Sequence, residues 1–142
     1  MQQLTPNLLW LGHAGEAQDS RHLFDTGIKA VIELAAEELP SQPPRELIYC
    51  RFPLVDSPDN DRAALFLAVS TVANLLERRV PTLVCCGSGL SRSPAIAAAA
   101  LALVYQEPPE ECLKQVAQLH RSDVSPGLWN QVVGLLDSLR SV

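Results

Sequence analysis

Apolar residues form short runs in the first half of the chain, each bounded by glycine, proline or a polar cluster. Runs of this length that are rich in leucine and β-branched residues predict buried strands. Four such strands are expected, over residues 7–12, 28–34, 47–54 and 82–86. A short helix is expected over 16–26, because Gly27 follows it as a left-handed helix stop. The loop 38–46 carries three prolines and separates two of the strands.

The second half of the chain has apolar residues at helical spacing. From Leu65 to Leu76 they recur in steps of four, three and four, which is one face of a helix over 62–78. Further helices are predicted over 93–106, 109–121 and 125–139. Strands come early and helices late, with a strand–loop–helix unit at 82–106. The chain is therefore expected to form a single α/β domain over residues 1–142, with a central, mostly parallel sheet flanked by helices.

The composition and net charge of the chain restrict the class of protein and the kinds of binding partner to be expected. The chain is 47% apolar and 19% charged, which is typical of a globular domain. Its net charge of −5 disfavours binding to nucleic acid or to anionic membranes. The longest apolar segment, Ala95–Tyr105, is too short to span a bilayer, and the first residues lack the pattern of a signal peptide. A cytoplasmic location is therefore expected.

The cysteines and histidines suggest neither a metal site nor a disulfide framework. Cys50, Cys85, Cys86 and Cys112 match no zinc-binding spacing, and the three histidines offer no paired ligands. A disulfide framework is typical of secreted chains, and this sequence has no secretory pattern. We therefore expect a reduced protein that needs no metal and no cofactor.

The stretch LVCCGSGLSRSPAI, residues 83–96, places reactive side chains between a predicted strand and a predicted helix. Ligands of open α/β sheets bind beyond the carboxyl ends of the strands. Glycines in this loop allow successive N–H groups to point inward as an anion cradle, to which the helix adds its positive end. Arg92 supplies a planar fork for two phosphate oxygens. The residues expected to bind a tetrahedral dianion are Gly87, Ser88, Gly89, Leu90, Ser91 and Arg92.

A cysteine at the base of this cradle would be activated by the same field, since helix N-termini and arginine lower the pKa of a thiol. Cys86 would then attack phosphorus, while the N–H groups and Arg92 stabilise the equatorial oxygens. A cysteine six residues before an arginine is a weak signal by itself, and the alternative is that Cys86 only packs in the core. The glycines, the serine after Arg92 and the flanking strand and helix favour the phosphate loop.

This stretch resembles the signature of the cysteine-based protein tyrosine phosphatases, His-Cys-x5-Arg-Ser/Thr, and most closely that of the compact, atypical dual-specificity phosphatases. The matching positions are Cys86, Gly89, Ser91, Arg92 and Ser93. The segments LLWLGHAGEAQD…GIKAVIEL, FPLVDSPDNDRAALF and HRSDVSPGLWNQ resemble the family's opening strand, general-acid segment and late Arg-x-x-x-Ser-Pro element. The likeness covers essentially the whole chain. It implies the protein tyrosine phosphatase-like (dual-specificity) fold and a cysteinyl-phosphate intermediate.

The resemblance also implies a general acid upstream of the cysteine. The family spacing places it 30 residues before the cysteine and 10 before a helical phenylalanine, which matches Asp56 and Phe66. Asp59 and Asp61 are the competing carboxylates. Asp61 is better placed to cap the helix that begins at Arg62. Asp56 is therefore the expected acid.

Other positions near the motif are interpreted with the same resemblance in view. Ser93 is expected to hydrogen-bond the Cys86 sulfur and to help it leave when the phosphoenzyme is hydrolysed, a role compatible with a plain helix cap. His120 is interpreted as a residue at the edge of the core. Arg121 is interpreted as a solvated charge at a helix end, with support of the loop or substrate as the alternative. Cys85 stands where the family has a histidine that orients the loop and helps to keep the thiolate ionised.

The expected function is hydrolysis of phosphotyrosine, and also of phosphoserine and phosphothreonine, in a phosphoprotein or phosphopeptide partner. The short chain lacks the extra length that deepens the pocket of phosphotyrosine-only enzymes. Inositol-lipid phosphatases favour basic loop residues, whereas GSGLS is neutral, and a sulfurtransferase of the rhodanese kind has no use for Asp56. The alternative is a phosphate-binding pseudophosphatase or interaction module with weak or no turnover, because Cys85 departs from the family pattern. The sequence does not indicate an oligomeric state.

Overall fold

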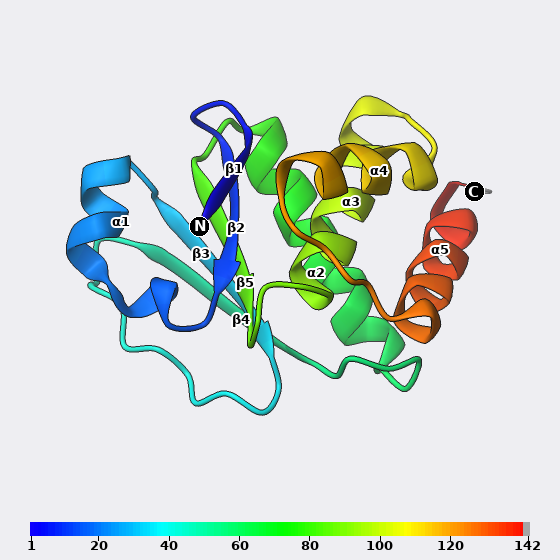
Figure 1. Cartoon of the computed structure of the whole chain (residues 1–142), viewed down its shortest axis with the longest axis horizontal. Helices are drawn as coiled ribbons and strands as arrows, with labels where there is room; N and C mark the ends of the chain where they lie inside the picture. Colours follow the sequence, from blue (N-terminus) through cyan, green and yellow to red (C-terminus); the bar gives the residue numbers. More distant parts are fainter. Residues whose placement is uncertain (141–142) are drawn as a thin grey trace.

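The computed structural model describes residues 1–140, which form a five-stranded sheet with helices on both faces (Figure 1). The strands are β1 (Gln2–Thr5), β2 (Leu9–His13), β3 (Ala30–Ala35), β4 (Ile48–Leu54) and β5 (Thr82–Cys86). The helices are the 3-10 helix η1 (Glu16–Gln18), α1 (Ser20–Thr26), α2 (Arg62–Glu77), α3 (Arg92–Tyr105), α4 (Pro109–Leu119) and α5 (Pro126–Arg140). The predicted α/β fold is confirmed.

Strand order determines which loops meet at the edge of the sheet. The order is β1-β2-β5-β3-β4, and β1–β2 is the antiparallel pair while the other neighbours run parallel. In the register of the central strand, Cys86 lies opposite His13 of β2, and Cys85 lies opposite Glu33 of β3. The carboxyl ends of β2, β5 and β3 therefore lie side by side, and the loops that follow them are neighbours.

Two hydrophobic clusters cover the two faces of the sheet. Helices α2, α3, α4 and α5 pack on the face that carries Val84 and Cys86, and α1 lies on the other side, as Figure 1 shows. The second cluster contains Leu83 and Cys85 together with Leu23 of α1. Successive side chains of a strand point to opposite faces. Cys85 and Cys86 are adjacent in sequence, but their side chains lie in different clusters.

The helix ends follow signals in the sequence. Gly27 ends α1 with φ 87°, which costs a glycine little, and Asp61 caps α2 by accepting a hydrogen bond from Ala64 N at 3.1 Å. Both features were predicted. The last residue of α4 is Leu119, two residues earlier than predicted, because the chain turns to an extended conformation at His120.

One strand was missed by the sequence pattern. β1 is a four-residue edge strand whose first two residues are exposed, and the sequence Gln-Gln-Leu-Thr has no apolar run. A tight turn joins it to β2, with Leu8 N donating to Thr5 O at 3.0 Å and Asn7 at φ 57°. Tertiary pairing with β2 stabilises this segment as a strand.

Among the helices within residues 1–140, none has the length and hydrophobicity that a membrane span requires.

Candidate active site

The loop between β5 and α3 brings Cys86 to the first turn of a helix. Ser93 N donates to Cys86 Sγ at 3.4 Å, and Ser93 Oγ lies 3.3 Å from the same sulfur. Both side chains are buried. The amino end of a helix and N–H donors directed at sulfur stabilise negative charge there. The predicted pair of Cys86 and Ser93 is therefore brought together in a geometry that suits a thiolate.

Arg92 is held by three acceptor atoms from two residues. Its Nη1 donates to Glu37 Oε1 at 2.6 Å and to Leu54 O at 2.9 Å, and its Nη2 donates to Glu37 Oε2 at 2.6 Å. A guanidinium has five N–H groups in a planar fork. These contacts use both N–H groups of Nη1 and one of Nη2. The Nε–H and the second Nη2–H, which share one edge of the fork, have no acceptor among residues 1–140 and can hold two oxygens of a tetrahedral anion.

Glu37 is a site residue that the sequence did not indicate. Its hydrogen bonds to Arg92 lower the pKa of the Glu37 carboxyl from 4.5 to about 2, and the same contact raises the pKa of the Arg92 guanidinium. The Glu37 side chain remains 57% exposed, so water and salt screen the pair. Glu37 follows β3, and its proximity to Arg92 depends on β3 lying beside β5, which the local pattern does not reveal.

Gly89 is required at the bend of the loop. Its φ is +78°, and a Cβ at this position would lie 2.9 Å from the carbonyl oxygen of Gly12 in β2. Both the positive φ and the close approach exclude a larger side chain. Ser88 is exposed beside it, and its Oγ accepts from Leu90 N at 3.3 Å. Gly89 therefore sets the bend of the predicted loop, and the Ser88–Leu90 hydrogen bond lies beside it.

Of the three candidate aspartates, Asp56 is the one that contacts the loop. Its Oδ1 accepts a hydrogen bond from Ser91 Oγ at 2.6 Å. The two competing carboxylates have other contacts: Asp59 lies 3.4 Å from Ser57 Oγ, and Asp61 caps α2. Asp56 is exposed, so a substrate can approach it from solvent. Its role as the acid stays a prediction.

Cys85 takes no part in the loop. Its Sγ points into the cluster on the opposite face and donates to Ile32 O at 3.6 Å. Burial raises the pKa of the Cys85 thiol far above its ordinary value, and the Glu33 carboxylate adds to the shift. The neutral thiol is not nucleophilic. The two adjacent cysteines therefore differ in surroundings, because Cys86 contacts Ser93 at the start of α3 and Cys85 lies in the cluster on the opposite face.

His120 lies against the loop, which the sequence interpretation did not include. Its Nε2 is 2.6 Å from Gly89 O. The interpretation as a residue at the edge of the core assumed that α4 continues, whereas α4 ends at Leu119 and the ring turns toward the loop. Arg121 is exposed, as a solvated charge would be.

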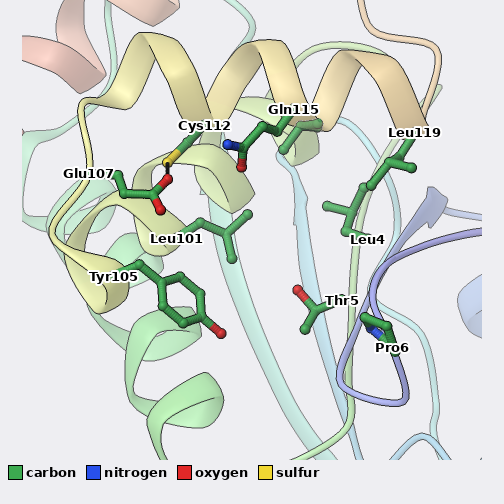
Figure 2. Close-up of a pocket in the computed structure, with 10 residues that line it drawn as sticks. Leu4, Thr5, Pro6, Leu101, Tyr105, Glu107, Cys112, Gln115 and Leu119 are labelled. Carbon is green, nitrogen blue, oxygen red and sulfur yellow. Dashed lines mark hydrogen bonds between the residues drawn. The ribbon is translucent and has the colours of Figure 1, made fainter.

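Two other features concern ligands. Among residues 1–140, no group of three or more histidine, cysteine, aspartate or glutamate side chains is placed to hold a metal ion. A cavity of about 310 Å³ lies at the carboxyl end of α3, between that helix, α4 and the β1–β2 turn. Figure 2 shows Leu101 and Tyr105 on one side of it and Leu4 and Leu119 on the other. It contains no residue of the Cys86 loop, so it is separate from the candidate active site.

Comparisons with known proteins identify the fold. No protein-family model matches the sequence, and no curated protein matches it significantly. Solved structures do match. Human DUSP28 has a TM-score of 0.86 at 22% identity, covering 99% of each chain. PTPMT1 has a TM-score of 0.81 at 20% identity, covering 99% of this chain and 96% of the other, and a further structure of PTPMT1 contains PI(5)P.

A third matching structure is that of a phosphatase-like protein. The human tyrosine phosphatase-like serine/threonine/tyrosine-interacting protein has a TM-score of 0.77 at 21% identity, covering 99% of this chain and 95% of the other. All these identities are below one quarter, so the likeness concerns the fold. The compact dual-specificity phosphatase fold implied by residues 83–96 is confirmed.

Proposed function

We propose that this chain, which has the dual-specificity phosphatase fold, hydrolyses phosphomonoesters through a cysteinyl-phosphate intermediate. One observation carries the proposal. The sulfur of Cys86 accepts the Ser93 N–H at the amino end of α3, beside an Arg92 whose Nε–Nη2 edge is free. This arrangement combines a nucleophile with an electrophilic clamp for the equatorial phosphate oxygens.

In the first step, Cys86 Sγ attacks phosphorus and the bond from phosphorus to the ester oxygen breaks. Arg92 and the N–H groups of the loop stabilise the charge on the three equatorial oxygens. Asp56 donates its proton to the leaving oxygen and becomes a carboxylate. The product is an alcohol or phenol together with phosphocysteine.

In the second step, the Asp56 carboxylate takes a proton from a water molecule, and the water oxygen attacks phosphorus. The sulfur–phosphorus bond breaks and returns the electron pair to sulfur. Ser93 Oγ, 3.3 Å from Sγ, stabilises the departing thiolate by hydrogen bonding. Inorganic phosphate leaves, and Asp56 is again protonated.

The proposed substrates are phosphotyrosine, phosphoserine and phosphothreonine in proteins. Asp56 and Ser88 are exposed, so these two residues beside Cys86 and Arg92 are open to a protein substrate. The loop residues between Cys86 and Arg92 are all neutral, and a basic loop would better suit an inositol lipid with several phosphates. Phosphopeptides are therefore preferred to phosphoinositides as first substrates to test.

The test compares the wild-type protein with Cys86→Ser. The wild type is expected to hydrolyse p-nitrophenyl phosphate and phosphotyrosine peptides, and a rapid quench should capture phosphate on Cys86 in the intact-mass spectrum. The Cys86→Ser variant should lose turnover but still bind vanadate, since Arg92 and the loop amides remain. Substantial activity in this variant would refute the covalent mechanism. Turnover of phosphoinositides in preference to phosphopeptides would refute the proposed substrate class.

A second candidate function is phosphate recognition without turnover. The observation in its favour is that Cys85 stands at the family's histidine position and points into the opposite face. A wild-type protein that binds phosphopeptides but does not hydrolyse them, with Cys86 not phosphorylated, would support this candidate against the enzyme.

A further inference from the structure

The connection between α4 and α5 contacts three consecutive residues of the phosphate loop. His120 Nε2 lies 2.6 Å from Gly89 O, Asp123 N donates to Leu90 O at 2.7 Å, and Ser125 N donates to Ser91 Oγ at 2.9 Å. Residues 120–125, which we name the anchoring segment, therefore hold one side of the loop from Gly89 to Ser91.

The two carbonyl contacts determine where the loop N–H groups point. In a trans peptide, the C=O of one residue and the N–H of the next point in opposite directions. The chain has no cis peptide bonds. When the Gly89 and Leu90 carbonyls are turned toward the anchoring segment, the N–H groups of Leu90 and Ser91 must point away from it. These N–H groups are then available to a bound anion.

The contacts of these two N–H groups agree with this orientation. Leu90 N–H has a long bond of 3.3 Å to the exposed hydroxyl of Ser88, which a phosphate oxygen can replace. Ser91 N–H has no acceptor among residues 1–140. The Gly89 and Leu90 carbonyls are turned toward the anchoring segment, and the N–H that follows each of them is free or only weakly hydrogen-bonded.

The protonation of the His120 ring follows from its partner. A carbonyl oxygen only accepts hydrogen bonds, so His120 Nε2 must carry the proton that Gly89 O receives. In the neutral ring, Nδ1 then holds a lone pair. This Nδ1 is buried and has no hydrogen-bond partner. An orphaned buried nitrogen is unfavourable, and an apolar side chain would avoid it. The ring is useful at this position because of its Nε2–H.

Gly89, whose carbonyl oxygen lies against His120, is conformationally constrained. Gly89 is buried, has φ +78° and packs against the backbone of Gly12. Without the His120 donor, Gly89 O would be a buried acceptor without a partner, and rotation of the Gly89–Leu90 peptide would bring that oxygen toward the anion. Cys85, on the opposite face of the sheet, gives the loop no hydrogen-bond donor, since its thiol donates to Ile32 O.

We propose that His120 is a positioning residue of the phosphate loop, whose Nε2–H fixes the Gly89 carbonyl outward so that the Leu90 N–H faces the bound phosphate. This inference rests on the proposed function only in taking phosphate as the ligand. His120 does not touch the reacting atoms. It acts through the orientation of one peptide group.

The test compares His120→Leu with His120→Gln in the whole protein. Leucine fills the space without a donor, whereas the amide nitrogen of glutamine is the same number of bonds from Cα as Nε2 and can replace it. The control is His22→Leu, because His22 is exposed on α1 at the far face of the sheet. Binding of inorganic phosphate is measured by calorimetry, and melting temperatures are recorded for every variant.

The expected result for His120→Leu is phosphate binding weakened by about tenfold or more, which corresponds to one lost hydrogen bond and an unsatisfied buried acceptor. His120→Gln should restore affinity to within about threefold of the wild type, whatever its melting temperature. Phosphate affinity unchanged in His120→Leu, or lost equally in the leucine and glutamine variants, would overturn the proposal.

A second measurement is independent of ligand and turnover. Heteronuclear NMR of the imidazole nitrogens should identify the Nε2–H tautomer for His120, with Nδ1 unprotonated. A ring protonated on Nδ1 alone would overturn the proposal. Failure of the proposed function can be distinguished from failure of this proposal. If the wild-type protein binds phosphate but does not hydrolyse p-nitrophenyl phosphate, the proposed function fails. The two His120 substitutions would still change phosphate affinity as described.

Discussion

Ser91 Oγ joins the candidate acid to the phosphate loop by donating to Asp56 Oδ1 at 2.6 Å. The same hydroxyl accepts from Ser125 N at 2.9 Å, so its single proton is directed to Asp56. Ser91 is buried, whereas Asp56 is exposed. A buried loop residue thus holds an exposed carboxyl group, and the remaining oxygen of Asp56 is available to a leaving group.

Asp56→Asn is expected to lower kcat by roughly 10²-fold or more, in line with the contribution of a general acid. The loss should shrink for esters whose leaving groups need little help from a proton. Steady-state kinetics on aryl phosphates of differing leaving-group pKa measure both effects. Asp59→Asn and Asp61→Asn are matched controls with the same chemical change. A larger loss in either control would identify a different acid.

Glu37→Gln is expected to lower kcat/KM by about tenfold, because glutamine has one acceptor oxygen and no charge. The guanidinium of Arg92 then loses one of the two hydrogen bonds that orient its free edge, and the other loses its carboxylate partner. Glu38→Gln is the control, since the neighbouring side chain makes no hydrogen bond to Arg92. Phosphate affinity is measured in parallel. An increase in phosphate affinity in Glu37→Gln would contradict the positioning role and would mean that Glu37 competes with phosphate for Arg92.

The Glu37–Arg92 pair also predicts a pH dependence of stability. The folded state lowers the pKa of Glu37 from 4.5 to about 2, so the pair stabilises the fold above the ordinary carboxyl pKa. That contribution should decline as the pH falls from about 5 to about 2. The difference in melting temperature between wild type and Glu37→Gln should therefore shrink over this interval, and also in high salt. A difference that does not vary with pH would exclude the pair as its source.

The two adjacent cysteines should differ in reactivity toward iodoacetamide. At neutral pH, alkylation should modify Cys86 and spare Cys85, because burial and Glu33 raise the pKa of the Cys85 thiol. Cys85→Ser and Cys86→Ser are alkylated side by side, and peptide mass spectrometry assigns the modified residue, because Cys50 and Cys112 are also free thiols. Rapid alkylation of Cys85 in the folded Cys86→Ser variant would contradict the division. Peroxide should oxidise Cys86 without forming a Cys85–Cys86 disulfide, since the two side chains occupy opposite faces.

Local sequence determined the central motif and the elements other than β1. The spacing of apolar residues predicted β3, β5 and α2 to within two residues at each end. Gly27 ends α1 and Asp61 caps α2, as expected. Strand alternation accounts for the placement of Cys85 and Cys86 on opposite faces of the sheet. The sequence from Cys86 to Ser93 contained the candidate nucleophile, the arginine and the helix start. These features depend on neighbours in the chain, and short-range rules of propensity and periodicity describe them.

Only the tertiary structure decided which distant residues complete the site. Glu37 reaches Arg92 because β3 pairs with β5, and His120 reaches Gly89 because α4 ends at Leu119. Ser91 distinguishes Asp56 from the other nearby carboxylates across 35 positions of sequence. Strand order and helix docking result from burial of apolar surface, which is non-directional and summed over the whole core. A local pattern therefore predicts what a residue can do, and the packed core determines which partner it meets.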